Sequence, residues 1–243
     1  MIAVEHLDLN VARHCNLRCV SCSHYSPIAS RWLMPLDMIE RDLLALRPIL
    51  KPRSVNVVGG EPLLHPEIAE ILKLLKRIRI DEKTVVITNG TLLPRMRDDF
   101  WRELECLKIS IYATLKPEIL ELAEAKCAEF GFELTSESFP EFFVQIKSVP
   151  DDGEESFKKC KWKSDCYTVH DGYFYLCPQS AFYPHVGHGD ALILTGITER
   201  LLREFMDSPE PLHACSTCAA ADLIPRAWSE ERNADEWRRK STV

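Results

Sequence analysis

Short apolar stretches alternate with amphipathic segments along the first 150 residues of the chain. The apolar stretches have the length and composition typical of strands, and they are Glu5–Val11, Ser54–Val58, Thr84–Thr88 and Leu107–Ile111. The segments between and after them repeat apolar residues every three or four positions, as helices do, and they are Pro35–Arg47, Pro66–Arg79, Leu93–Leu104 and Pro117–Phe130. Alternating strands and helices predict an α/β protein with a parallel sheet.

The end of this pattern predicts an incomplete barrel. Glu133–Ser136 and Phe142–Lys147 are expected to be two further strands. Only the segment 137–141 separates them, whereas a crossover between parallel strands needs at least about 10–12 residues. A helix therefore does not fit between the last two strands, and we expect a barrel that is truncated at its closing end.

Composition and charge narrow the class of protein. The chain has 243 residues, which exceeds the usual size of a single domain and favours one core with an appendage. The net charge of −7 does not indicate the basic surface that nucleic-acid binding requires. There is no signal peptide after Met1, and no apolar run approaches the ~20 residues that cross a bilayer. We therefore expect a cytoplasmic protein with no membrane or nucleic-acid partner, in which clustered cysteines indicate metal binding or catalysis.

Three cysteines follow the first predicted strand with the spacing C-x3-C-x2-C. Cys15, Cys19 and Cys22 can hold three corners of an iron–sulfur cube, and no fourth cysteine lies nearby in the sequence. Clusters of this kind are normally held by four cysteines, so a set of three leaves one iron open to another ligand. A structural zinc site is the alternative. The three-residue first gap and the missing local fourth ligand argue against zinc.

A glycine-rich motif follows the second predicted strand, about 40 residues after the cysteine loop. Gly59, Gly60, Glu61 and Pro62 lie where an α/β fold places ligands, and the glycines let the backbone approach a ligand closely. Polar residues also end the next two predicted strands. These are Thr88 and Asn89 after the third strand, and Ser110 and Tyr112 at the fourth.

These motifs together resemble the radical S-adenosylmethionine (radical SAM) enzymes. The resemblance implies an open, partial (β/α)6-type TIM barrel over residues 1–150, with a [4Fe–4S] cluster on Cys15, Cys19 and Cys22. It also implies that SAM binds the open iron and contacts the Gly59–Pro62 motif and the polar residues that end the third and fourth strands. One departure is Ser21, where the family usually has an aromatic residue. His24 or Tyr25 is a candidate to replace that contact with adenine.

The last hundred residues carry a second set of cysteines. Cys160, Cys166 and Cys177 surround a predicted hairpin whose turn is Asp171-Gly172, and Cys215 and Cys218 form a distant C-x2-C pair. The arrangement resembles the twitch domain, the short form of the SPASM extension, which binds one auxiliary [4Fe–4S] cluster. A structural zinc site with four cysteine ligands is the alternative, because spacing does not distinguish zinc from iron.

Five cysteines are present for four positions in this set. The family spacing selects Cys160, Cys177, Cys215 and Cys218 as ligands and leaves Cys166 over. The alternative makes Cys166 a ligand and Cys160 the spare. A spare thiol near a cluster is a candidate hydrogen-atom donor. The resulting organisation is a barrel over 1–150, a twitch domain over 151–222 and a tail over 223–243.

The resemblance implies a hydrogen-atom abstraction from a carbinol C–H of a small molecule such as a sugar, an aminocyclitol or a nucleotide sugar. SAM is cleaved to a 5′-deoxyadenosyl radical by one electron from a donor such as flavodoxin or ferredoxin. A dehydrogenase then passes an electron to the auxiliary cluster, whereas an epimerase returns a hydrogen atom from Cys166. We favour the dehydrogenase, because the stronger motif accounts for its electron acceptor. A peptide-modifying maturase is the other alternative, although the chain begins directly on its first predicted strand.

Overall fold

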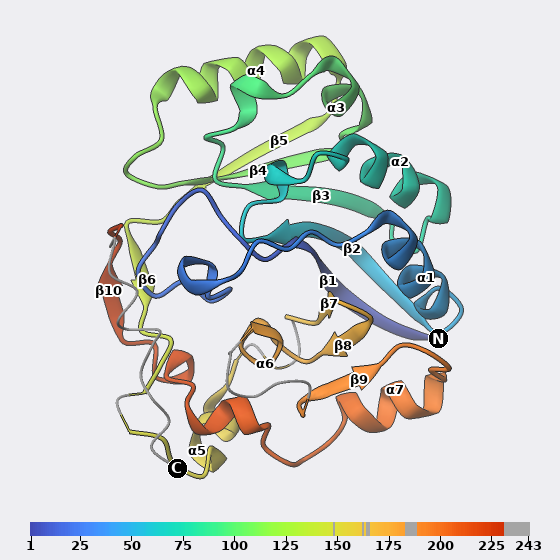
Figure 1. The fold of residues 1–243 in the computed structure, drawn as a ribbon, viewed down its shortest axis with the longest axis vertical. Helices are drawn as coiled ribbons and strands as arrows, with labels where there is room; N and C mark the ends of the chain where they lie inside the picture. The colour runs from blue at the N-terminus through green and yellow to red at the C-terminus, as the bar shows by residue number, and fades with distance from the viewer. Residues whose placement is uncertain (148, 162, 164–165, 183–188, 231–243) are drawn as a thin grey trace.

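The computed structural model describes residues 1–147, 149–161, 163, 166–182 and 189–230. Five parallel strands follow one another in the first part of the chain, namely β1 (Ile2–Ala12), β2 (Leu50–Gly59), β3 (Lys83–Thr88), β4 (Cys106–Ile111) and β5 (Glu133–Ser138). The connecting helices are α1 (Leu36–Leu46), α2 (Ile68–Ile78), α3 (Asp98–Glu103) and α4 (Pro117–Phe130). These helices lie together on the outer side of the curved sheet (Figure 1). The predicted α/β alternation is thus confirmed.

The strands and helices form where their apolar residues predict them. The stripe of α2 is buried as expected and consists of Ile68, Ile71, Leu72, Leu75 and Ile78. Helix α4 begins at Pro117, a position where a backbone N–H would have no partner within the helix, so proline loses nothing by lacking it. The helix is closed by Gly131, whose φ of 77° is left-handed. One hydrophobic core joins the barrel strands to the C-terminal part of the chain, where Phe174 and Leu202 are fully buried.

The segment predicted as one helix over Leu93–Leu104 is divided. It contains a short 3-10 turn, η3 (Leu93–Arg95), and then α3 from Asp98. Arg97 between them has an extended backbone, and the indole of Trp101 donates a hydrogen bond of 3.3 Å to the carbonyl of Met96. The extended backbone of Met96 and Arg97 interrupts the helix, which starts again at Asp98.

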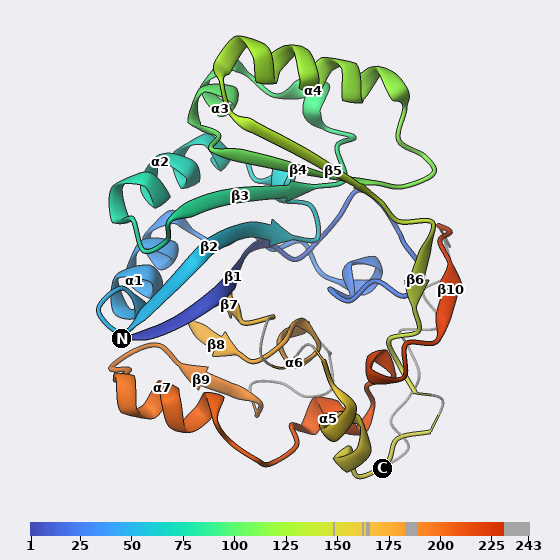
Figure 2. The ribbon, with the colours of Figure 1, turned by 180° about the vertical axis from the view of Figure 1, so that it is seen from behind.

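The strand predicted over Phe142–Lys147 is shorter than expected and lies outside the barrel. The short strand β6 (Glu141–Phe143) leaves the main sheet and pairs antiparallel with β10 (Pro225–Ala227) in a sheet of its own. The chain turns away at Pro140, because the link after β5 is too short to return to the far end of the sheet. Both views place this small sheet beside the open mouth of the barrel (Figures 1 and 2).

The place beside β1 is taken by a strand from the C-terminal part. Strand β7 (Thr168–His170) runs parallel to β1, with Asp8 opposite Thr168. It continues as a hairpin with β8 (Tyr173–Tyr175) and then β9 (Ala191–Ile193), which gives the order β5-β4-β3-β2-β1-β7-β8-β9. The hairpin turn at Asp171-Gly172 is confirmed, and both residues have positive φ, as a tight two-residue turn requires.

Short elements complete the described chain. Helix α5 (Glu154–Lys159) and helix α6 (Pro178–Phe182) flank the hairpin, and helix α7 (Glu199–Met206) follows β9. The 3-10 turns are η1 (Ser26–Ile28), η2 (Pro62–Leu64), η4 (His213–Ser216) and η5 (Ala220–Asp222). In the described part of the chain, no helix is both long and apolar enough to cross a membrane. The result is a partial barrel whose mouth is bordered by the cysteine loop after β1 and by the C-terminal elements.

Candidate cofactor and substrate site

The cysteine loop is anchored to the glycine motif where β1 and β2 end. The amide of Gly60 donates a 2.7 Å hydrogen bond to the carbonyl of Ala12, and the amide of Glu61 donates one of 3.0 Å to the carbonyl of His14. A Cβ on Gly59 would lie 2.4 Å from the Ala12 oxygen, and one on Gly60 would lie 2.2 Å from the His14 oxygen. Glycine is therefore required for this close backbone approach.

The three cysteines of the loop line a cavity of about 340 Å³ at the mouth of the barrel. The same cavity is lined by nearly every residue that the sequence assigned to SAM, namely Gly59, Gly60, Glu61, Thr88, Asn89, Ser110 and Tyr112. Pro62 begins η2 just behind this lining. The structure thus brings together residues from the ends of four strands, because the carboxyl ends of parallel strands meet at one edge of the sheet.

Asn89 connects the end of β3 directly to the cysteine loop. Its Nδ2 lies 3.6 Å from the Sγ of Cys15 and donates a 3.0 Å hydrogen bond to Oδ1 of Asn16. The amide of Leu17 also lies 3.3 Å from the same sulfur. Asn16 was missed by the sequence reasoning, although its position next to Cys15 would have been a signal. These donors fit a sulfur that carries negative charge as a metal ligand.

The three thiols themselves fit an iron–sulfur cluster. Burial raises the pKa of Cys15, Cys19 and Cys22, and the nearby thiolates of Cys19 and Cys22 raise that of Cys15 further. Three thiolates close together, one buried and two half-buried, need a positively charged partner, and bound iron would replace their protons. Thiolate sulfur is also the ligand that iron–sulfur clusters prefer. Within the described residues, no group of three His, Cys, Asp or Glu side chains is arranged to hold a single metal ion.

Glu61 holds the glycine motif against the end of β3. Its carboxylate accepts hydrogen bonds from Thr88 Oγ1 at 2.6 Å, from the Asn89 amide at 3.0 Å and from the Leu63 amide at 3.0 Å. The side chain is only 1% exposed. Burial raises the pKa of Glu61 from its ordinary 4.5 to about 7, although the three hydrogen bonds favour the charged form. Glu61 therefore acts chiefly as a brace between two strand ends.

The iron-free protein is expected to lose stability through Glu61 as the pH rises from about 4.5 to 7. In this range only the unfolded chain releases the proton, so the folded state binds more protons and the free energy of unfolding falls. At about 1.4 kcal/mol for each pH unit, the loss amounts to about 3 kcal/mol over the window. Denaturant unfolding at several pH values should show a smaller fall in Glu61→Gln than in the native protein. The exposed Glu82→Gln is the control, and equal slopes in native protein and Glu61→Gln would contradict the assignment.

All five cysteines of the C-terminal set line a second cavity of about 210 Å³. Cys160 follows α5, Cys166 precedes β7, Cys177 follows β8, and Cys215 and Cys218 lie in and after η4. Burial raises the pKa of Cys215 to about 11, and the neighbouring thiolates of Cys218 and Cys160 raise it further. Burial likewise raises the pKa of Cys177 to about 12, with a further rise from Cys218 and Cys215.

The Cys215–Cys218 pair is held by contacts from both sides. The carboxylate of Asp190 accepts 2.7 Å hydrogen bonds from the amides of His213 and Ala214, and this buried side chain thereby fixes the start of η4. Ser156 of α5 donates a 3.1 Å hydrogen bond to the carbonyl of Cys218. A Cβ on Gly153 would lie 2.8 Å from the amide of Ser216, so α5 starts directly against η4.

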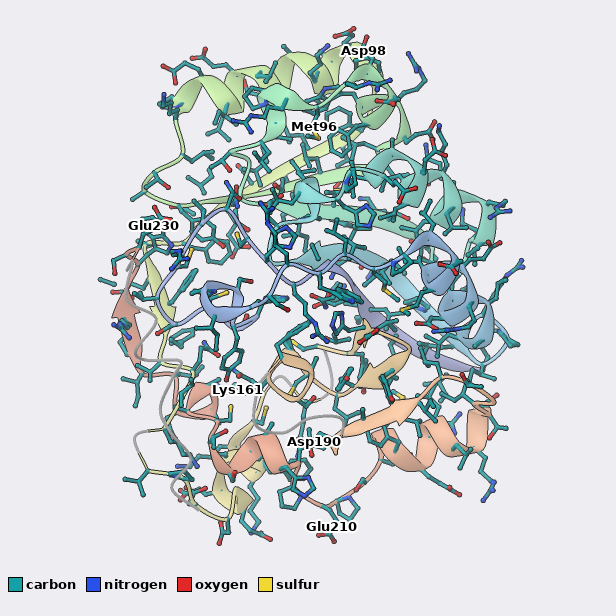
Figure 3. The ribbon with its side chains drawn as sticks, in the orientation of Figure 1. Met96, Asp98, Lys161, Asp190, Glu210 and Glu230 are labelled. Atoms are coloured by element: carbon teal, nitrogen blue, oxygen red, sulfur yellow. The ribbon has the colours of Figure 1, made fainter. Side chains whose placement is uncertain are left out.

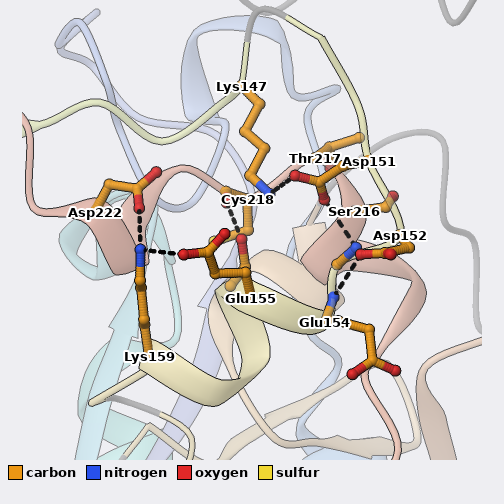
Figure 4. A network of polar contacts seen from close by, with 12 residues as sticks. Lys147, Asp151, Asp152, Glu154, Glu155, Lys159, Ser216, Thr217, Cys218 and Asp222 are labelled. Carbon is orange, nitrogen blue, oxygen red and sulfur yellow. Dashed lines mark hydrogen bonds and ion pairs between the residues drawn. The ribbon is translucent and has the colours of Figure 1, made fainter.

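Charged residues around α5 support the same segment. Lys147 pairs with Asp151 at 2.5 Å, and Lys159 pairs with Glu155 at 2.6 Å and with Asp222 at 4.0 Å (Figure 4). These exposed pairs add little stability individually. Of these, the Lys159–Asp222 pair joins α5 to η5, and both elements contribute to the lining of the second cavity. The ammonium group of Lys147 is therefore used in an ion pair.

The two cavities adjoin one another. Ser23, Phe143 and Gln145 line both of them. Gln145 accepts a hydrogen bond from Nε2 of Gln179, and Gln179 accepts one from the hydroxyl of Tyr25. This chain of side chains was not found from the sequence, because its three members lie far apart along the chain and carry no motif.

Several other polar side chains and thiols have structural contacts. Arg13 donates a 2.7 Å hydrogen bond to Nε2 of His170 and pairs with Asp171 at 3.6 Å, so it fastens the hairpin to β1. Cys127 donates a hydrogen bond to the carbonyl of Phe132 from the apolar side of α4. His24 lines the first cavity, whereas Tyr25 turns to Gln179. His185 and His188 lie outside the described residues.

Comparisons with known proteins find similarity to radical SAM proteins over part of the chain. The radical SAM superfamily model matches residues 9–114. The GTP 3′,8-cyclase of Chlorobaculum tepidum is 35% identical over 96 residues, which are 39% of this chain and 28% of the cyclase. That of Helicobacter pylori strain 26695 is 26% identical over 159 residues, or 61% of this chain and 49% of the cyclase. The chain thus spans less than half the length of these relatives.

Solved structures of three proteins share the fold at low sequence identity. BtrN in complex with AdoMet and 2-DOIA has a TM-score of 0.58 at 12% identity, covering 85% of this chain and 83% of BtrN. His-tagged anSMEcpe with bound AdoMet has a TM-score of 0.55 at 16% identity and covers 85% and 81%. Streptococcus suis SuiB bound to S-adenosylmethionine has a TM-score of 0.53 at 15% identity and covers 85% and 66%. At these identities the likeness concerns the fold.

Proposed function

Since this chain belongs to the radical SAM superfamily, whose enzymes use a [4Fe–4S] cluster and SAM, we propose that it is a dehydrogenase of a small polyhydroxylated molecule. Cys15, Cys19 and Cys22 would hold the SAM cluster in the first cavity. Four cysteines of the second cavity would hold an auxiliary [4Fe–4S] cluster, as in a twitch domain spanning 151–222. An external flavodoxin or ferredoxin would supply the electron.

The observation that carries this proposal is the contact between the two cysteine-lined cavities. Ser23, Phe143 and Gln145 form their common border. A substrate placed at this border lies between the site where a hydrogen atom is removed and the site that would accept an electron. Oxidation of a carbinol to a ketone needs both, because it removes two electrons and two protons from the substrate.

The roles of the chain's residues follow from this placement. When bound, SAM and its cluster supply the 5′-deoxyadenosyl radical, which takes the carbinol hydrogen atom. Gly59, Gly60 and Asn89 shape the SAM side of the cavity, and Glu61 braces them. The substrate radical then loses its hydroxyl proton and one electron to give the ketone. The auxiliary cysteines hold the acceptor of that electron.

The cavity lining favours a sugar or an aminocyclitol as substrate. The polar side chains that line the two cavities are hydroxyls, amides, an imidazole and carboxylates, among them those of Ser23, His24, Glu141, Gln145 and Gln179. Hydroxyl and amide groups fit the hydroxyls of such a ring, and the carboxylate of Glu141 fits an ammonium group. Phosphate groups are bound more favourably by arginine, lysine or helix N-termini, so the lining side chains fit a substrate without phosphate better than a phosphorylated one.

The proposal is tested with anaerobically reconstituted protein, SAM and a chemical reductant. Aminocyclitols and sugars without phosphate are expected to stimulate formation of 5′-deoxyadenosine, with one ketone formed for each SAM cleaved. GTP is the comparison substrate, because the cyclase relatives carry that name. Stimulation by GTP alone would exclude the proposed substrate class. Stimulation only by a peptide would favour a maturase.

The epimerase alternative depends on Cys166, which lines the second cavity beside the four other cysteines. If Cys166 is the spare thiol, Cys166→Ser should keep both clusters, whereas Cys160→Ser should lose about four irons. Iron analysis of the two variants measures it, and loss of iron in Cys166→Ser alone would reverse the roles. Deuterium from solvent at an inverted carbinol carbon in the native protein, absent in Cys166→Ser, would identify an epimerase.

A further inference from the structure

The end of the described chain lies against the cysteine loop after β1. We call residues 225–230, which comprise β10 and the three residues after it, the C-terminal strap. The amide of Val20 donates a 3.0 Å hydrogen bond to the carbonyl of Ser229, and the amide of Arg18 donates one of 3.0 Å to Oε1 of Glu230. Cys19 and Glu230 form an isolated antiparallel bridge. Glu230 is labelled at this edge of the molecule in Figure 3.

Trp228 is the strap residue that stacks on Tyr112, a residue of the first cavity. Its indole is parallel to the ring of Tyr112 within 7°, with 5.6 Å between ring centroids. Its amide donates a 2.9 Å hydrogen bond to the carbonyl of Pro140, at the point where the chain leaves β5 for β6. Tyr112 in turn lines the cavity and contacts Phe142 edge-on. The stacking on Tyr112 and the backbone hydrogen bond to Pro140 together fix the position of Trp228.

The indole N–H of Trp228 has an unusual environment. Nε1 is buried, and within the described residues no acceptor completes a hydrogen bond with it. The thiol of Cys19 lies next to this N–H, because the strap pairs with the cysteine loop at Cys19 and Val20. A neutral thiol is a weak acceptor, but a sulfur bound to iron carries the negative charge that an N–H donor needs.

We propose that Trp228 is a positioning residue of the SAM-cluster site, whose Nε1–H donates a hydrogen bond to the Sγ of Cys19 when that sulfur binds iron. This inference rests on the cluster in the first cavity and is independent of the substrate and of the second cluster. Hydrogen bonds to cluster sulfurs stabilise the more negative reduced state and raise the reduction potential. The C-terminal strap would thus set how readily the cluster accepts the electron that cleaves SAM.

A redox titration monitored by EPR tests the proposal without any substrate. Trp228→Phe keeps an aromatic ring against Tyr112 and removes only the donor, so its SAM cluster is expected to have a more negative midpoint potential than the native one. Ser229→Ala, which keeps its backbone contact with Val20, is the matched control and should titrate like the native protein. An unchanged midpoint potential in Trp228→Phe would overturn the proposal.

A second measurement uses the native sequence and so does not depend on the stability of a variant. Protein labelled with 15N in the indole of tryptophan should show a 15N coupling to the reduced SAM cluster in pulsed EPR. The absence of such a coupling in the labelled native protein would overturn the proposal. Because neither readout requires turnover, failure of the dehydrogenase assignment leaves both of them interpretable.

Discussion

Replacing Cys15, Cys19 and Cys22 together with alanine should remove about four irons from the reconstituted protein and abolish reductive cleavage of SAM. The three thiols line one cavity and are the sulfur ligands that the loop after β1 offers there. Without them the cluster has no anchor, and the open iron that would bind SAM is lost with it. Iron analysis and chromatography of 5′-deoxyadenosine measure the two losses.

The double variant Cys106→Ala/Cys127→Ala is the control for this experiment. Cys106 is buried in β4, and Cys127 donates its hydrogen bond within the α4 region, so neither thiol lines either cavity. The control is expected to keep its iron and its SAM cleavage, with some loss of stability. SAM cleavage retained by the triple variant would refute the assignment of the loop.

Replacing Gly60 with alanine should disrupt the SAM side of the cavity. The added Cβ would lie 2.2 Å from the carbonyl oxygen of His14 and 2.8 Å from that of Arg13. Both neighbours are backbone atoms of the segment that leads into Cys15, so the glycine motif and the cysteine loop must move apart. We expect an overpacking cost of about 1–3 kcal/mol and at least roughly a tenfold loss of SAM affinity. Thermal unfolding and equilibrium binding of SAM measure these effects.

The variant Gly196→Ala is the control that separates the steric clash expected in Gly60→Ala from the strain of a left-handed backbone. Gly196 has a φ of 75°, but a Cβ there would meet nothing within 4 Å. It should therefore cost some stability through the left-handed backbone while SAM binding stays at the native level. Equal SAM affinities in Gly60→Ala and the native protein would mean that the glycine motif does not shape the SAM site.

The part of the site that could be predicted from the sequence is local in the chain. Cys15, Cys19 and Cys22 carry their spacing within one loop, and Gly59-Gly60 directly follows a recognisable strand. The carboxyl ends of parallel strands meet at one edge, so Asn89 and Ser110 were placed correctly at the same cavity as the cysteines. The helix stripe of α2 was predicted for the same reason, since periodicity within a segment reports its buried face.

The features that could not be predicted depend on contacts between distant segments. Strand β7 pairs with β1 through only two residue pairs, Asp8 with Thr168 and Leu9 with Val169. Trp228 reaches Tyr112 only because β10 pairs with β6, and a three-residue strand leaves no periodic signal in the sequence. The sequence predicted a strand over Phe142–Lys147 but gave no indication that it pairs with residues 225–227.

The most direct test of the proposed function is the iron and sulfide content of anaerobically reconstituted protein, combined with EPR in the presence and absence of SAM. Two [4Fe–4S] clusters predict about eight irons, with a reduced-cluster signal that changes when SAM is added. About four irons would leave the second cavity without a cluster and contradict the dehydrogenase, because its electron acceptor would be missing. Zinc in place of iron would contradict both cluster assignments.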